Sequence, residues 1–182
     1  MKEKEQDKQF KLNFELIPDS CWYSNLRSIL QPKMWEVVRH DAYDRAEGKC
    51  MICGKVCRRL EAHERWSYDE KKHVQKLEDV VAVCHNCHSV IHIGRTQLVG
   101  NDNRAITHFC KVNGCKYMDY VHALGEANRV HQRRNKVSEW KLDLSWLNRF
   151  VERGADQTAD EKRVKGLIDK VNKLFNELHS NT

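Results

Sequence analysis

The sequence contains few of the residues that interrupt regular structure, with only 2 prolines and 8 glycines among 182 residues. Such a composition excludes collagen-like, proline-rich and low-complexity chains. No apolar run approaches the roughly 18 residues that a membrane-spanning helix needs. The charged first residues, MKEKEQDKQFK, also lack the apolar stretch of a signal peptide. We therefore expect a cytoplasmic protein with no membrane partner, built as one domain or as one small domain with appendages.

Charge is abundant but only slightly unbalanced. Charged residues make up 32% of the chain and hydrophobic residues 40%, and the formal net charge is +6. A modest positive surplus suits a nucleic-acid partner, although an ordinary protein surface can carry the same charge.

The periodicity of apolar residues predicts a chain rich in helices with a short β-rich segment near its middle. The polar residues 1–11 are expected to form a disordered arm. Strands are expected over residues 58–64 and 77–84, separated by a loop over residues 65–75. Helices are expected over residues 25–30, 35–46, 86–94, 104–113, 117–134 and 144–152. A last helix is expected to begin at a capping box of Thr158 and Glu161 and to carry an apolar stripe from Val164 to Leu178. We expect this stripe to pack within the molecule, with self-association as the alternative.

Two CxxC pairs give the strongest chemical signal in the sequence. Cys50 and Cys53 are separated by thirty residues from Cys84 and Cys87. Each pair places two sulfur atoms on one turn, which is the arrangement that a tetrahedral zinc site requires. Clustered cysteines in a cytoplasmic chain more often bind metal than form disulfides. We therefore predict a closed, structural Zn2+ site, with Cys57 as a competing ligand.

A second zinc site at Cys110 and Cys115, with His108 and His122, is a weaker possibility, because no partner pair of matching spacing exists.

Histidines cluster around the second CxxC pair. His88 and His92 are four residues apart on the helix that begins at this pair, so their side chains project from one face. His63 lies at the end of the first predicted strand, which a zinc knuckle would bring beside that helix. Three histidines that leave open coordination positions are typical of a catalytic metal site.

The order of these motifs resembles the ββα-metal (HNH) endonucleases, and most closely their zinc-knuckle branch. The resemblance covers residues 49–95 and rests on CxxC, LEAHE, LEDVVAVC and CHNCHSVIH. It implies an α+β fold in which a small ββα-metal core with a four-cysteine zinc knuckle is embedded in flanking helices. The implied organisation is an N-terminal arm and short helix over residues 1–34, the ββα-metal domain over residues 35–98, and a helical region over residues 99–182.

The resemblance also assigns roles to individual residues. His88 and His92 fall on metal-binding positions, and His63 on the metal ligand that precedes the general base. Glu64 then occupies the base position, where the family usually has histidine. In the alternative register His63 is the base, and His88 and His92 hold the ion together with Asp79 or Glu61. A carboxylate is a weaker base than imidazole at neutral pH.

The function implied is hydrolysis of phosphodiester bonds in DNA, or less readily RNA, by a metal-dependent endonuclease. The catalytic residues would be Glu64, His63 and His88, with Mg2+, Mn2+ or a similar ion on His63, His88 and His92. Backbone contacts are expected from Arg65, Arg95, Arg133 and Arg134. The protein would act as a monomer or homodimer, and phage or mobile-element settings are common for this family. The alternative is a catalytically degenerate zinc module that binds nucleic acid or a protein partner.

Overall fold

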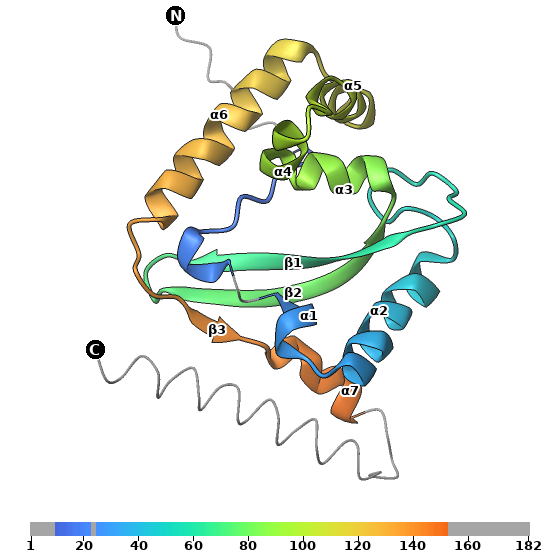
Figure 1. The fold of residues 1–182 in the computed structure, drawn as a ribbon, viewed down its shortest axis with the longest axis vertical. Coiled ribbons are helices and arrows are strands. Elements are labelled where there is room, and N and C mark those ends of the chain that lie inside the picture. The colour runs from blue at the N-terminus through green and yellow to red at the C-terminus, as the bar shows by residue number, and fades with distance from the viewer. Residues whose placement is uncertain (1–9, 23–24, 153–182) are drawn as a thin grey trace, which may run out of the picture.

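A computed structural model describes residues 10–22 and 25–152, with side chains up to residue 150 (Figure 1). The helix predicted around residues 158–178 lies outside these residues. The fold is of the mixed α+β class that the sequence predicts, with a small sheet and helices on both of its faces. Within the described part of the chain, no helix is long and apolar enough to cross a membrane.

The sheet is a long antiparallel hairpin with one short added strand. β1 (Glu61–Asp69) pairs with β2 (Val74–Val83), and β3 (Lys141–Asp143) adds to β2 in parallel. Successive side chains of a strand point to opposite faces, so β2 supplies two cores. Val81 and Val83 belong to one core, and Val80 and Ala82 belong to the other. Leu77 also joins the second core, because a register shift interrupts the alternation between Leu77 and Asp79.

The helices divide between these two faces (Figure 1). On the first face lie α3 (His85–Ile91), α4 (Ile93–Leu98), α5 (Asp102–Asn113) and α6 (Tyr117–Arg134). On the second lie α1 (Leu26–Ile29), α2 (Pro32–Ala46) and α7 (Asn148–Glu152). Single-turn 3-10 helices occupy Asp19–Cys21 and Ser145–Leu147.

The hairpin is longer than the sequence predicts. Residues 65–75 were expected to form a loop, but β1 continues to Asp69 and β2 begins at Val74. Tertiary contacts outweigh the polar composition here, because Tyr68 packs against Trp140 at 5.1 Å between ring centroids and lies under the Arg134 guanidinium. A register shift between Arg65 and Trp66 accommodates the extension.

Three further predictions of element bounds need correction. α2 begins at Pro32 and not at residue 35, because proline suits the first turn of a helix. The helix expected over residues 86–94 breaks at His92 (φ −91°, ψ 48°) and continues as α4. The segment 144–152 contains two short helical turns instead of one helix, and the three residues of β3 carried no recognisable strand signal.

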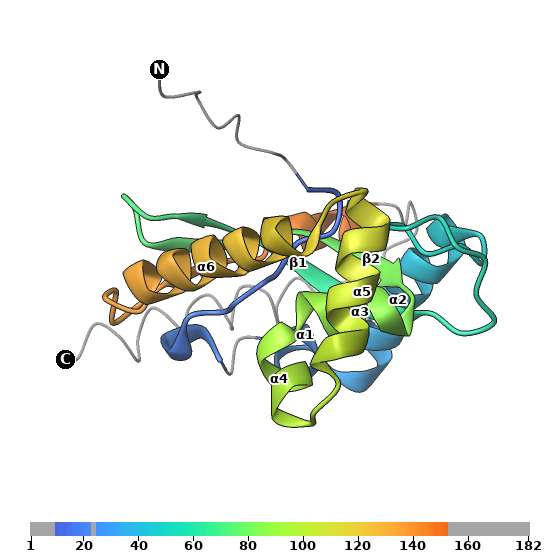
Figure 2. The same ribbon diagram turned by 90° about the horizontal axis from the view of Figure 1, so that it is seen from above.

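The N-terminal segment docks against the helices of the first face (Figure 2). Leu12 and Phe14 are buried, and Phe14 stacks on Phe109 of α5 at 5.1 Å between centroids. The backbone of Leu12 is held at both ends by one side chain, since its N–H donates to Asn113 Oδ1 (3.0 Å) and its carbonyl accepts from Asn113 Nδ2 (2.8 Å). Leu12 and Phe14, which follow the predicted arm of residues 1–11, therefore contribute to the core.

Candidate metal centres

The first CxxC pair lies on a tight turn that precedes β1. Cys50 N–H donates to the carbonyl of Lys55 at 2.9 Å, and Gly54 N–H donates to the carbonyl of Cys50 at 2.8 Å. Gly54 adopts φ 73°, a left-handed conformation that glycine tolerates best. The turn needs this conformation to direct both cysteines to the same side.

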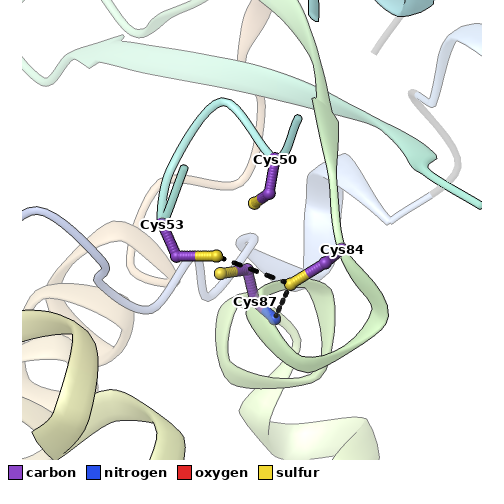
Figure 3. Close-up of side chains that lie close together, drawn as sticks. All are labelled: Cys50, Cys53, Cys84 and Cys87. Carbon is purple, nitrogen blue, oxygen red and sulfur yellow. Dashed lines mark hydrogen bonds between the residues drawn. The ribbon is translucent and has the colours of Figure 1, made fainter. Parts of the chain in front are cut away.

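The second CxxC pair begins α3. Cys84 is the N-cap of the helix, and its sulfur accepts from the N–H of Cys87 at 3.5 Å. Figure 3 shows the four side chains converging, with Cys53 Sγ 3.8 Å from Cys84 Sγ. All four sulfur atoms lie within 4.8 Å of one another. The predicted tetrad is confirmed as a cluster that can hold a metal ion such as zinc.

The environment of the tetrad favours a thiolate at Cys50, whereas burial raises the pKa of Cys53, and the hydrogen bond to Cys50 together with burial raises the pKa of Cys87. A hydrogen bond from Cys87 lowers the pKa of Cys50 to about 4, and backbone N–H groups of the turn act in the same direction. Thiolate is the form that binds metal. His108 Nε2, from α5, lies 3.2 Å from Cys87 Sγ, and no local sequence pattern indicates this contact.

The other cysteines that were considered as zinc ligands stand outside the tetrad. Cys57 Sγ donates to the carbonyl of Lys55 at 3.4 Å. Cys110 and Cys115 join no metal-ligand cluster among the described residues.

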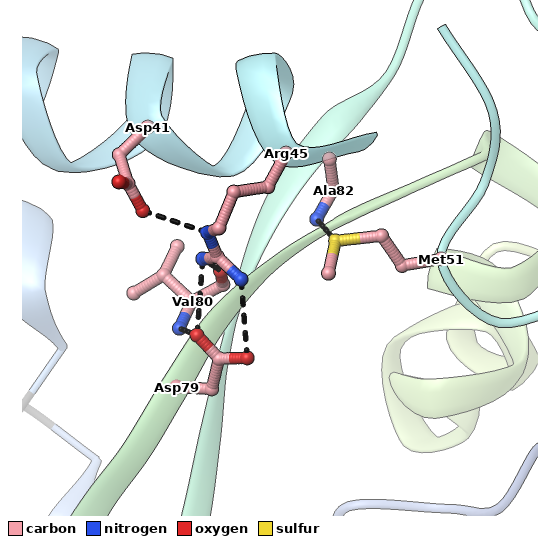
Figure 4. A network of polar contacts seen from close by, with 6 residues as sticks. All are labelled: Asp41, Arg45, Met51, Asp79, Val80 and Ala82. Atoms are coloured by element: carbon pink, nitrogen blue, oxygen red, sulfur yellow. Dashed lines mark hydrogen bonds and ion pairs between the residues drawn. The ribbon is translucent and has the colours of Figure 1, made fainter. Parts of the chain in front are cut away.

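A network on the second face of the sheet fixes the turn to β2 (Figure 4). Met51 N–H donates to the carbonyl of Ala82 at 3.0 Å, and Ala82 N–H donates back to Met51 Sδ at 3.3 Å. Arg45 of α2 bridges Asp41 (2.8 Å) to Asp79 (3.0 Å) and also donates to the carbonyl of Val80. The turn, α2 and β2 therefore form one rigid support for the tetrad.

The three predicted histidines meet beside the tetrad. His63 comes from β1, His88 from α3, and His92 from the break between α3 and α4. Ring centroids are 4.7 Å apart for His88 and His92, 4.9 Å for His63 and His92, and 5.4 Å for His63 and His88. One nitrogen of each ring lies within 4.8 Å of the others. We call this cluster the histidine centre.

The donor set of the histidine centre suits a divalent cation. Burial, together with the neighbouring rings of His63 and His88, lowers the pKa of His92 to about 3. Burial also lowers the pKa of His88, against the opposing hydrogen bond to Glu61. Neutral imidazole is the metal-binding form. His63 is 2% exposed, and its Nδ1 has no hydrogen-bond partner among the described residues, so the centre contains a buried nitrogen that an ion would satisfy.

Two carboxylates border the histidine centre. Glu61 accepts hydrogen bonds from Nδ1 of His88 and from Nδ1 of His85, the latter at 3.0 Å. Glu61 precedes His63 by two residues, so strand alternation places both on one face. Glu15 Oε2 lies 3.2 Å from His63 Nε2. Because Glu15 is 48 residues away in sequence, no local pattern pointed to it.

Glu64, the residue at the predicted base position, makes its hydrogen bond to α1. It follows His63 on β1, and its Oε1 accepts a hydrogen bond from the N–H of Leu26 at the start of α1 at 3.0 Å. Its strand partner Val80 belongs to the core of the second face. In this structure the Glu64 carboxylate is engaged at the first residue of α1, and Asp79 pairs with Arg45. Glu64 still lies close enough to His88 for its charge to oppose the lowering of the His88 pKa.

The four arginines predicted to contact nucleic acid do not form one cluster, although Arg95 lies close enough to His92 for its charge to lower the pKa of that imidazole. Arg133 and Arg134 both bind Glu70 at the hairpin tip, at 2.6 Å and 3.3 Å. Arg65 lies on β1 and Arg95 on α4, and both are exposed. A different set of four arginines lines a groove of about 960 Å³ that reaches His88 and Glu61, namely Arg27, Arg39, Arg58 and Arg59. Two aromatic side chains, Trp35 and Tyr43, line the same groove.

No protein-family model, curated protein or solved structure matches the chain.

Proposed function

We propose that the protein is a metal-dependent endonuclease of the HNH type that hydrolyses phosphodiester bonds, with DNA as its substrate. The observation that carries the proposal is the convergence of His63, His88 and His92 immediately beside a four-thiol cluster. Four thiols close a structural site, whereas three imidazoles leave coordination positions for water and substrate. The α+β context, in which a β-hairpin is followed by α3, agrees with the resemblance seen in the sequence.

Different residues would bind the ion, orient its ligands and support the helix that carries them. His63, His88 and His92 would hold a divalent ion such as Mg2+ or Mn2+, with imidazole ligands favouring the later transition metals in vitro. When bound, this ion supplies Lewis-acid stabilisation of the charge that develops on the phosphate and on the leaving oxygen. Glu61 fixes the orientation of His88 by accepting from its Nδ1. The four cysteines hold α3 against the turn and so set the position of His88 and His92.

The groove beside His88 supports a polynucleotide substrate. Arginine guanidinium groups bind phosphate oxygens in a bidentate manner, and aromatic rings stack on bases. Arg27, Arg58 and Arg59 are exposed, and Arg39 forms an ion pair with Glu36. Phosphates bound along these side chains would pass directly beside His88. We assign the role of backbone-binding residues to this set in addition to the sequence-predicted Arg65 and Arg95.

The alternative function is a zinc module that binds nucleic acid without cleaving it. The observation that favours it is the position of Glu64, whose carboxylate is engaged at α1 rather than at the histidine centre. In this case the groove would bind the polynucleotide and the histidine centre would not turn over.

Cleavage of supercoiled plasmid by the purified protein tests the proposal. Mg2+, Mn2+, Co2+ and Ni2+ are supplied in turn, with EDTA and the variant His88→Ala as controls. We expect nicked and linear products that depend on the added ion and disappear in both controls. Binding of the plasmid without cleavage under every ion would overturn the nuclease and favour the zinc module.

A further inference from the structure

The two ring nitrogens of His63 have very different surroundings. Nε2 lies 3.2 Å from the carboxylate of Glu15. Nδ1 is buried and lacks a hydrogen-bond partner among the described residues. Because a carboxylate accepts and does not donate at neutral pH, the proton of a neutral His63 belongs on Nε2. The free lone pair then lies on Nδ1.

We propose that Glu15 is a positioning residue of the histidine centre, which holds His63 as the Nε2–H tautomer and leaves Nδ1 to bind the metal ion. The proposal rests on the divalent ion of the proposed function and not on the cleavage reaction itself. It adds to the centre a residue from outside the segment that carries the family resemblance.

His88 provides the comparison that supports this assignment. Its Nδ1 faces Glu61, so its Nε2 remains free for a metal. Each of these two histidines thus has one ring nitrogen that contacts a carboxylate and one that does not. The contacting nitrogen is Nε2 in His63 and Nδ1 in His88. Metal-binding histidines usually donate their second N–H to a carboxylate or carbonyl, which fixes the tautomer and raises the basicity of the ligand.

Glu15 is presented by a segment that is itself fixed in place. Its own N–H donates to the carbonyl of Ile91 at 3.0 Å, next to His92 at the end of α3. The preceding Phe14 is stacked on Phe109 and meets Tyr120 edge to face at 5.5 Å. Asn113 holds Leu12 by two hydrogen bonds. Because the backbone is anchored on both α3 and α5, the Glu15 carboxylate is directed at His63 rather than left in solvent.

The tautomer of His63 can be read directly by long-range proton–nitrogen NMR of the full chain labelled with nitrogen-15. The protein is first loaded with one equivalent of Zn2+ for the cysteines and then titrated with a second equivalent. We expect His63 to be protonated at Nε2 and His88 at Nδ1. Protonation of His63 at Nδ1 would overturn the proposal. Nε2 would then be the metal-binding atom, and the Glu15 carboxylate beside it would be a further ligand of the ion.

Affinity for the second equivalent gives an independent measurement. We expect Glu15→Ala to weaken binding about 10- to 100-fold, the range seen when such supporting partners are removed. Glu15→Gln should fall between the parent and Glu15→Ala, because its amide oxygen still accepts from Nε2–H. Glu126→Gln, which changes an exposed glutamate of α6, is the matched control and should keep the parental affinity.

The outcomes separate this proposal from the nuclease. Parental affinity in Glu15→Ala, with the first zinc equivalent retained, would overturn the positioning role whatever the plasmid assay shows. The expected tautomers and affinities without plasmid cleavage would overturn the nuclease while supporting the role of Glu15.

Discussion

The four-thiol cluster and the histidine centre both take side chains from α3, yet they differ in burial, in the number of candidate ligands and in the groups that support them. Cys84 and Cys87 lie at the start of α3. Both are buried, as is Cys50 of the preceding turn. His88 directly follows Cys87, His92 ends the helix one turn later, and the His88 side chain is 25% exposed beside a groove. The first cluster offers four candidate metal ligands and the second offers three. A single short helix therefore contributes to both clusters.

The groups that support the two sets also differ. The thiols are supported by N–H donors of the turn and of α3, together with His108. The imidazoles are supported by carboxylates, Glu61 and Glu15. N–H donors stabilise a thiolate such as that of Cys50, whereas acceptors orient imidazoles and increase their basicity. The two clusters thus differ in the kind of group that supports their ligands.

Loss of a thiol should have the largest effect on the molecule. We expect Cys84→Ser to release zinc and to lower the melting temperature by about 10 °C or more, because metal binding contributes directly to folding. Elemental analysis and calorimetry measure the two effects. Cys57→Ser is the matched control and should keep both zinc and stability. Undiminished zinc in Cys84→Ser would remove the tetrad assignment.

Loss of an imidazole should abolish plasmid cleavage without unfolding the protein. We expect His88→Ala and His92→Ala each to reduce plasmid cleavage by about a thousandfold or more, since each removes a ligand of the open site. Zinc content should stay at one equivalent per chain, as measured by elemental analysis. His122→Ala, an exposed histidine on α6, should behave like the parent. Cleavage at the parental rate in both centre variants would contradict the assignment.

His108 offers a test of intermediate size on the thiol side. Removing its contact with Cys87 in His108→Ala should weaken zinc retention about 10- to 100-fold, since groups that support a metal ligand have effects of this order. Competition with a chromophoric chelator measures the zinc affinity. The affinity of the histidine centre for its ion should not change in this variant. Equal losses at both centres would show that they are coupled through α3.

Substitution of Glu64 should have the smallest effect on stability, and it tests directly whether Glu64 is the general base. Because its carboxylate accepts from Leu26 N–H, we expect Glu64→Gln to cost about 1 kcal/mol of unfolding free energy. Divalent-ion affinity should be unchanged, whereas His63→Ala should weaken it. Chemical denaturation and calorimetric titration provide the measurements. Complete loss of cleavage with the metal still bound would instead assign the base to Glu64, as the sequence resemblance predicts.

The sequence predicts the two clusters because most of their residues are close neighbours in the chain. CxxC and the four-residue spacing of His88 and His92 define geometry within one turn, and the strand alternation explains why Glu61 joins His63. Glu64 illustrates the limit of that information. Adjacent residues of a strand face opposite sides, and only the position of α1 shows where the Glu64 carboxylate is engaged. Glu15, His108 and the arginines of the groove come from distant segments, so their contacts depend on packing that no local pattern encodes.

The hold of Asn113 on Leu12 has a consequence for the order in which the molecule is assembled. The two residues are 101 positions apart, so at a synthesis rate of about 5 to 20 residues per second, Asn113 follows Leu12 from the ribosome by about 5 to 20 s. During that interval Glu15 and, later, the three histidines are already made, but the anchor that directs Glu15 toward His63 is not. A nascent chain therefore carries Glu15 and the three histidines of the centre before Asn113, which holds Leu12 in place, has been synthesised.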